Sequence, residues 1–313
     1  DDSGMARALL FDDQHRALES QAARQGEILD PNMKEMQVVS KSKRKQQRKK
    51  SAGSGFGATS STSSQKRKDK SEEETEILAA ALEENGVVLV PGVLKREMAA
   101  ELRECLLREI EEMRNTIIEE PAKSFSLFNV PADIYLSAPR GYVLLPFRET
   151  ESVNQGPEHV GTLVKATRAL LSPGAPLSRL FGRMCDGLES QLYDFCALRT
   201  EPGAARQVIH SDTPHQEIPG LFCAFIAVQD VTMPMGGTLF IPKTHTQTSE
   251  RLRFDGGDTE GMLKDAKPQY ALLKAGDAAF FDMRTLHAGL ANHLAEEGGA
   301  TRILMAITFR NLN

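Results

Sequence analysis

The length, composition and charge of the chain exclude several classes of protein. Its 313 residues are enough for one large or two medium domains. The net charge is −5, but residues 34–70 hold twelve Lys or Arg against two acidic side chains, a local charge of +10 that leaves −15 on the remainder. This acidic remainder excludes a globular domain with a general nucleic-acid-binding face, because such domains carry a basic patch. No run reaches the roughly 18 apolar residues of a membrane span, and no signal peptide is recognisable, so we expect no membrane partner.

The cysteines indicate a reducing environment. They lie in apolar or helical contexts, at no spacing typical of a metal knuckle: Cys105, Cys185, Cys196 and Cys223. We therefore predict buried free thiols rather than disulfides, and an intracellular protein whose compartment the sequence does not resolve.

The sequence of the N-terminal quarter, residues 1–75, indicates little packed structure. Residues 9–30 show loose helical spacing and predict an isolated helix, whereas residues 36–74 are rich in Ser, Gly, Lys and Arg and predict a disordered linker. We assign residues 1–75 to an N-terminal helix and a basic low-complexity linker, largely disordered, and residues 76–313 to a folded domain. The basic runs fit a solvated spacer, or a tail for nuclear import or polyanion binding, so any nucleic acid is expected to bind through this tail alone.

The first half of the folded domain reads as helical. A helix beginning near Glu76 should close at Gly86, because glycine is favoured at helix C-termini. Residues 87–94 predict a strand stopped by Pro91-Gly92. Helical patterns follow at residues 95–115, 157–172 and 175–192.

The second half reads as strands. Short runs rich in Val, Ile, Leu and Phe are separated by turn signals at residues 193–203, 206–212, 221–231, 236–245, 270–283 and 301–311. Many short strands at this spacing are typical of a sandwich or barrel. Helices followed by strands predict an α+β fold: a double-sheet jelly roll with helices packed on its outside.

A histidine and a carboxylate stand two residues apart in the stretch "QVIHSDTPHQ". In an extended strand His210 and Asp212 would lie on one face. His287 follows a later apolar strand, just before Gly289, so a barrel could bring it to the same place. Two imidazoles and one carboxylate leave half of an octahedral coordination sphere open, an arrangement typical of non-haem Fe(II) oxygenases.

Several of these motifs resemble one family. The segments "HSDT", "GGTLFIPKTH", "GDAAFFDMRTLHAG" and "TRILMAITFRN" are similar to those of the phytanoyl-CoA dioxygenase-like branch of the Fe(II)/2-oxoglutarate oxygenases. "NGVVLVPGVL" resembles the opening of the family's domain, so the likeness spans residues 76–313 and is weakest over 115–191. Lys243-Thr244-His245 stands where the family commonly has Gly-Ser-His.

The resemblance implies a double-stranded β-helix core, flanking helices and a catalytic metal site. His210, Asp212 and His287 would hold Fe(2+), with 2-oxoglutarate as co-substrate and O2 as oxidant. It also implies a basic residue on a later strand that binds the far carboxylate of 2-oxoglutarate. Arg302 matches that position, with Arg310 as its rival and a structural salt bridge as the alternative for either.

Weaker candidates surround these residues. Gln207 would share the face of His210 and contact the co-substrate, and Thr238 and Phe225 would line the pocket, although both also fit an ordinary barrel interior. The remaining predictions concern polar side chains near the ligands: His215 and Arg284 as substrate contacts, His245 as a cap of its own turn, and His293 as a solvated residue.

The reaction implied is hydroxylation of an unactivated C–H of a small organic substrate, with release of succinate and CO2 by a monomeric enzyme. Asp212 favours hydroxylation, since related halogenases have a small residue in place of that carboxylate. Two alternatives stay open: an oxygenase acting on protein or nucleic acid tethered by the basic tail, and a non-catalytic jelly-roll protein that only binds metal. Oxygen-dependent decarboxylation of 2-oxoglutarate would distinguish the catalytic readings from the last one.

Overall fold

The computed structural model describes residues 34–35, 61–119, 139–145, 157–185 and 191–312. Within these ranges the chain is a mixture of helices and largely antiparallel sheets, as the α+β prediction requires. The helix predicted at residues 9–30 and the first part of the predicted linker, residues 36–60, lie outside the described residues.

Most of the helical residues lie in the first half of the fold. The helices there are α2 (Ser61–Asn85), α3 (Arg96–Glu119), α5 (Pro157–Leu171) and α6 (Pro176–Met184). Among the later strands lie α7 (Ser249–Asp255), α8 (Thr259–Asp265) and a 3-10 helix at Ala295–Glu297. The predictions for α3 and α5 are confirmed. The predicted helix over 175–192 was too long, because α6 ends at Met184 and a strand begins at Gln191.

Helix α2 corrects the predicted extent of disorder. It begins at Ser61, so residues 61–74 are helical, although composition predicted disorder there. Its second half, residues 66–74, is rich in Lys, Arg and Glu, which are good helix formers. The helix is also anchored by tertiary packing that composition does not report: Arg179 Nε donates to Thr75 Oγ1 at 2.9 Å. Its C-terminal end agrees with the prediction, since Gly86 adopts a φ of +76° and its N–H bonds to the Leu82 carbonyl at 2.7 Å.

Two sheets form the β structure. The strands are β1 (Lys34–Glu35), β2 (Val87–Val90), β3 (Arg140–Leu144), β4 (Gln191–Thr200), β5 (Leu221–Ala227), β6 (Thr238–Phe240), β7 (Gln269–Ala271), β8 (Ala278–Asp282), β9 (His287–Gly289) and β10 (Arg302–Arg310). The larger sheet has the order β2-β8-β5-β10-β4-β3 and the smaller one β1-β7-β6-β9. Only the β1–β7 pair is parallel among the described strands.

Two predicted strands differ from the structure. Residues 206–212 form no regular strand, and His210 makes an isolated antiparallel bridge to His287 instead. Residues 270–283 are divided between β7 and β8 by a turn in which Gly276 has a φ of +90°. Glycine suits this turn because a left-handed backbone is costly for other residues.

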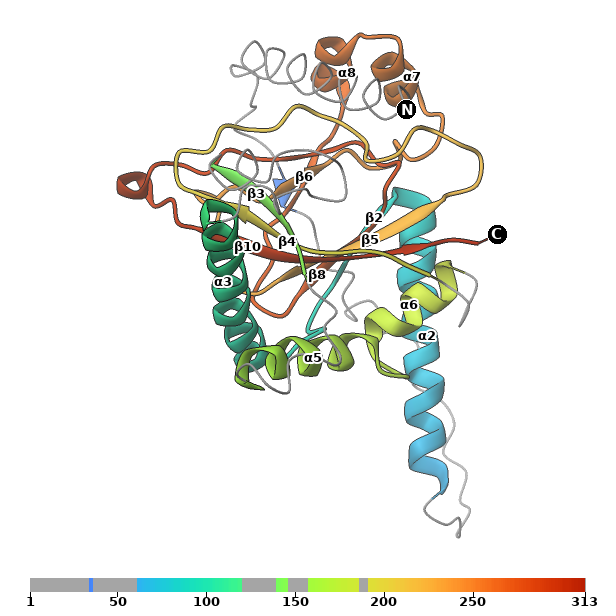
Figure 1. Ribbon diagram of the computed structural model, residues 1–313. Coiled ribbons are helices and arrows are strands. Elements are labelled where there is room, and N and C mark those ends of the chain that lie inside the picture. The colour runs from blue at the N-terminus through green and yellow to red at the C-terminus, as the bar shows by residue number, and fades with distance from the viewer. Residues whose placement is uncertain (1–33, 36–60, 120–138, 146–156, 186–190, 313) are drawn as a thin grey trace, which may run out of the picture.

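The helices and the two sheets enclose separate apolar cores. Helices α2, α3, α5 and α6 lie next to the larger sheet (Figure 1). Helices α7 and α8 lie at the top of the view in Figure 1, on the opposite side of the sheets from α5. One core packs these four helices against the outer face of the larger sheet, and a second fills the space between the sheets, with Cys196, Phe240 and Phe281 among its members. All four cysteines are free and buried, as predicted. Among the described residues, no helix has the length and apolar character to cross a membrane.

Candidate metal and co-substrate site

Three predicted ligands converge between the two sheets. Their ligand atoms all lie within 4.8 Å of one another. His210 Nε2 is 3.6 Å from one carboxylate oxygen of Asp212, and His287 Nε2 is 3.5 Å from the other. Asp212 lies in the bend after the bridge, and its N–H bonds to the Met283 carbonyl at 3.0 Å, which holds the bend to the end of β8.

Backbone carbonyls orient both imidazole rings. His210 Nδ1 is 2.8 Å from the Val208 carbonyl, and His287 Nδ1 is 2.9 Å from the Thr285 carbonyl. A carbonyl only accepts, so each Nδ1 carries the proton and each Nε2 offers its lone pair, which is the tautomer that metal binding needs. Burial lowers the pKa of His210, and the nearby His287 lowers it further, against an opposite effect of Asp212. The donor set therefore fits a divalent iron ion.

An aromatic wall encloses one of the ligands. The His287 ring lies 5.1 Å from Phe281, 5.7 Å from Phe240 and 6.5 Å from Phe225 between ring centroids. Phe225, predicted from the sequence to line the pocket, thus lies beside the ligand. The surrounding rings limit the access of water to this side of the triad.

Arg302 has the properties expected of a carboxylate receptor. It begins β10 and is 4 % exposed. Its Nη2 donates to Thr200 Oγ1 at 3.1 Å, whereas Nε and Nη1 have no hydrogen-bond partner among the described residues. Burial lowers the pKa of Arg302 to about 9, and the positive charge of Arg140 is a second, smaller cause. Buried donors without partners are costly, so this guanidinium fits an anionic ligand that would satisfy them.

Arg140, at the start of β3, is a second guanidinium that the sequence reasoning missed. It donates to the carbonyls of Ala205 and Leu290 at 2.6 Å and to Thr200 Oγ1 at 3.4 Å. It thereby joins β3 to the segment after β9, and it shares Thr200 with Arg302. Burial lowers the pKa of Arg140 to about 10. No motif marks this residue in the sequence, since its place beside Arg302 arises from strand pairing.

Gln207 and Thr238 lie close to the same end of the site. Gln207 Oε1 accepts a hydrogen bond from the Gly289 N–H at 2.8 Å, and Thr238 is buried and paired with Gly289. Gln207 and Arg140 occupy the place that a side chain at position 289 would take. A Cβ on Gly289 would lie 2.6 Å from Gln207 Oε1 and 2.8 Å from Arg140 Nη1. The absence of a side chain at Gly289 is what lets these groups approach.

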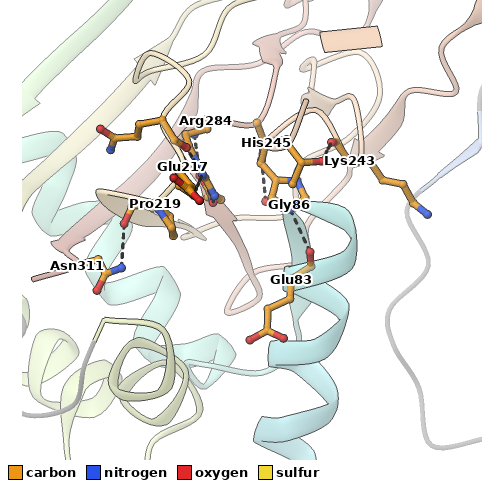
Figure 2. Close-up of polar contacts among 12 residues, drawn as sticks. Glu83, Gly86, Glu217, Pro219, Lys243, His245, Arg284 and Asn311 are labelled. Carbon is orange, nitrogen blue, oxygen red and sulfur yellow. Dashed lines mark hydrogen bonds and ion pairs between the residues drawn. The ribbon is translucent and has the colours of Figure 1, made fainter. Parts of the chain in front are cut away.

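Arg284, predicted to contact substrate, is engaged by groups of the protein itself. Its guanidinium forms a buried ion pair with Asp282 at 2.6 Å and donates to the carbonyls of Gln216 and Glu217 (Figure 2). Those donors hold the loop that follows Asp212 against the end of β8. Arg284 is therefore a positioning residue for the loop.

The other polar candidates lie away from the triad or are engaged elsewhere. His245 does not cap its own turn: its Nε2 lies 3.1 Å from the Glu83 carbonyl at the end of α2 (Figure 2). Arg310 is exposed and lies over the Tyr193 ring at 5.2 Å, so it lacks the burial and the unpartnered donors of Arg302. His293 is exposed, as predicted, and His215 is half-buried with no hydrogen bond at Nδ1 among the described residues.

A comparison with protein families agrees with this geometry. Residues 82–295 match the family described as phytanoyl-CoA dioxygenase (PhyH). The chain belongs to this family. It carries the domain of a dioxygenase family, and its His-Asp-His cluster could hold a metal ion, so the resemblance seen in the sequence is confirmed.

Known proteins similar to this family member support the same conclusion on fold. The dioxygenase FrzG of a Cladobotryum species is 35% identical over 106 residues, which is 31% of this chain and 34% of FrzG, so the similarity spans about a third of that relative. Among solved structures, the non-haem α-ketoglutarate-dependent carbocyclase SnoK from nogalamycin biosynthesis is 18% identical with a TM-score of 0.50, covering 77% of this chain and 85% of SnoK. AviO1 from Streptomyces viridochromogenes Tue57 is 16% identical with a TM-score of 0.50, covering 76% of this chain and 95% of AviO1. At these identities the structural likeness concerns the fold alone.

Proposed function

We propose that the protein is an Fe(II)- and 2-oxoglutarate-dependent oxygenase that hydroxylates an unactivated C–H of a small organic substrate and releases succinate and CO2. Its catalytic core would be a double-stranded β-helix. The observation that carries the proposal is the convergence of two imidazole Nε2 atoms and one carboxylate within 4.8 Å. Such a set leaves coordination positions open for a bidentate co-substrate and O2.

His210, Asp212 and His287 are the proposed iron ligands. Iron with 2-oxoglutarate and O2, when bound, supplies the oxidant that cleaves the C–H bond. The chain contributes preorganisation: the Val208 and Thr285 carbonyls fix the two rings, and the Met283 carbonyl fixes the Asp212 backbone. Because the pKa of His210 is lowered, its ring stays neutral and available as a ligand at neutral pH.

Arg302 is the proposed receptor for the far carboxylate of 2-oxoglutarate. Its Nε and Nη1 have no partner among the described residues, and Nη1 together with the second hydrogen of Nη2 can donate to one carboxylate as an end-on fork. Arg140 adds a second positive charge, and Thr200 bonds to both guanidinium groups, which fixes their relative position. Gln207 and Thr238 would complete the wall of this co-substrate pocket.

Removal of the ligand carboxylate tests the proposal. Asp212→Ala should lose most bound iron and should release no succinate from 2-oxoglutarate under air. Asp230→Asn is a matched control, because Asp230 is an exposed partner of Arg96 on another part of the surface. Iron is measured in the purified proteins by mass spectrometry and succinate by chromatography.

The outcomes separate the alternatives. Iron binding by the unaltered protein without succinate release, with or without candidate substrates, would favour a non-catalytic metal protein. Equal succinate release by the unaltered protein and Asp212→Ala would contradict the assigned ligand set.

A further inference from the structure

An acidic side chain faces the interior between the sheets but takes no part in the proposed iron and co-substrate chemistry. Side chains of a strand alternate between its faces, so Asp194 shares a face of β4 with Cys196 and Thr200. Cys196 belongs to the apolar core between the sheets, and Thr200 bonds to the inward-facing Arg302. The Asp194 carboxylate therefore projects into the same interior as the iron ligands.

Strand register places Asp194 at the level of the triad and away from the proposed co-substrate receptor. The Phe281 ring lies 5.1 Å from the His287 ring, and Phe281 pairs through Cys223 and Thr308 with Asp194. Thr200, beside Arg302, is six residues from Asp194 along β4. At about 3.3 Å per residue, the Arg302 receptor is roughly 20 Å from the Asp194 carboxylate along this strand.

Contacts around the thiol of Cys223 agree with the placement of Asp194 near the triad. Thr308 of β10 pairs with Asp194 on one side and with Cys223 on the other. Burial raises the pKa of Cys223, and the carboxylates of Asp212 and Asp194 both raise it further. One small buried side chain is thus within electrostatic reach of a proposed iron ligand and of Asp194.

The carboxylate is oriented but not neutralised. Tyr142 donates its hydroxyl to Asp194 Oδ1 at 2.7 Å. Burial raises the pKa of Tyr142, and so does its contact with Asp194, which keeps the phenol in its neutral, donating form. Within the described part of the chain, Asp194 has no ion-pair partner, and Arg310, on the neighbouring strand, lies over Tyr193. A partly buried carboxylate without a cation is costly, so its presence inside the fold calls for a ligand that compensates it.

We propose that Asp194, positioned by Tyr142, binds a protonated amine of the substrate, so that the enzyme acts on basic, nitrogen-containing small molecules. An ammonium group would donate charge-assisted hydrogen bonds to the Asp194 carboxylate. The partly buried Phe225, whose ring lies 6.5 Å from the His287 ring, would contact the hydrocarbon part and leave a carbon atom near the iron. An anionic substrate would be repelled by Asp194. This inference rests on the proposed oxygenase function for its catalytic meaning, and its binding step is testable separately.

Matched probes test the charge preference. The full chain loaded with Fe(II) and 2-oxoglutarate is titrated without O2, by calorimetry, with cyclohexylmethylammonium, cyclohexylmethanol and cyclohexanecarboxylate. We expect the ammonium ion to bind about tenfold or more tightly than the alcohol, because hydrogen bonds between charged groups are stronger than those of a neutral hydroxyl. The carboxylate should bind most weakly. Equal affinity for the ammonium ion and the alcohol would overturn the inference.

Variants assign the preference to the residue. Asp194→Asn keeps the shape but removes the charge, and it should abolish the discrimination between ammonium ion and alcohol. Tyr142→Phe should reduce it, whereas Asp230→Asn, which alters an exposed carboxylate, should keep it. Discrimination retained in Asp194→Asn would contradict the assignment.

A parallel succinate assay separates this inference from the proposed function. The unaltered protein could release succinate from 2-oxoglutarate and show no preference for the ammonium ion. That result would contradict the proposed substrate class but not the oxygenase function. An Asp194-dependent preference without any succinate release would contradict the oxygenase function and support the amine-binding site.

Discussion

His210 and His287 are direct partners in an antiparallel backbone pair: the N–H of His210 bonds to the His287 carbonyl at 3.0 Å, and the N–H of His287 bonds to the His210 carbonyl at 2.8 Å. Because each residue donates to and accepts from the other, backbone hydrogen bonds fix the separation of the two rings without a metal. Their ring centroids lie 4.6 Å apart. The proposed metal site is thus preorganised by the pairing that closes this side of the smaller sheet.

Replacement of the buried guanidinium should affect co-substrate binding. In Arg302→Lys a single ammonium replaces the two-nitrogen fork, so the KM for 2-oxoglutarate should rise about tenfold or more, with a smaller change in kcat. Steady-state kinetics with varied 2-oxoglutarate measures this. Arg310→Lys is the matched control, because Arg310 is exposed and stacks on Tyr193. A larger rise in KM for the Arg310 variant would reassign the receptor.

The contact between Gly289 and its two neighbours should be sensitive to one methyl group. In Gly289→Ala the added Cβ would displace Gln207 Oε1 and Arg140 Nη1, and Arg140 has little freedom because two carbonyls hold it. We expect a higher KM for 2-oxoglutarate, measured by succinate formation. Gly182→Ala, where a Cβ meets nothing within 4 Å in helix α6, should leave that KM unchanged. Unaltered kinetics in both variants would argue that the pocket does not extend to Gly289.

A strained residue offers a route to higher stability. Lys243 has a φ of +70°, the only positive φ of a non-glycine residue in the described ranges. In Lys243→Gly the relief of about 1–2 kcal/mol of strain should outweigh glycine's entropic cost of about 0.5–1 kcal/mol, so the free energy of unfolding should rise by up to about 1 kcal/mol. The lost ion pair with Glu84 is exposed and contributes little.

Chemical denaturation of the iron-free protein measures this change. Lys243→Ala removes the same ion pair without relieving the strain, so it should show no gain. Equal stability of the glycine and alanine variants would contradict the role of the backbone.

The stability of the iron-free protein should fall in mild acid. Burial lowers the pKa of His245 below its ordinary value of 6.5. As the pH falls below 6.5, the unfolded chain takes up a proton at this residue more readily than the folded protein, so the free energy of unfolding decreases. The His210 pKa is shifted in the same direction.

Unfolding by urea between pH 5 and pH 8 checks this dependence. His245→Gln should show a shallower loss of stability toward acid than the unaltered protein, because one of the two shifted groups is gone. An identical slope in both proteins would show that protonation of His245 is not linked to folding.

The sequence by itself determined which residues could hold a metal. The imidazoles of His210 and His287 and the carboxylate of Asp212 are donors that suit Fe(II), and their places at the ends of apolar runs could be read without coordinates. Gly86 marked the end of α2 for a local reason, since only glycine readily adopts its backbone angle. Such features depend on neighbouring residues in the chain, which is why sequence patterns report them.

Only the tertiary structure decided which distant groups share one space. The alternation of Arg206 to Asp212 predicted a strand, but the pairing of His210 with His287 limits it to a single bridge. Arg140 and Asp194 carry no motif, and their places beside Arg302 and at the level of the proposed iron ligands follow from strand register. The physical reason is that periodicity specifies the face on which a side chain lies, whereas long-range hydrogen bonding specifies what that face meets.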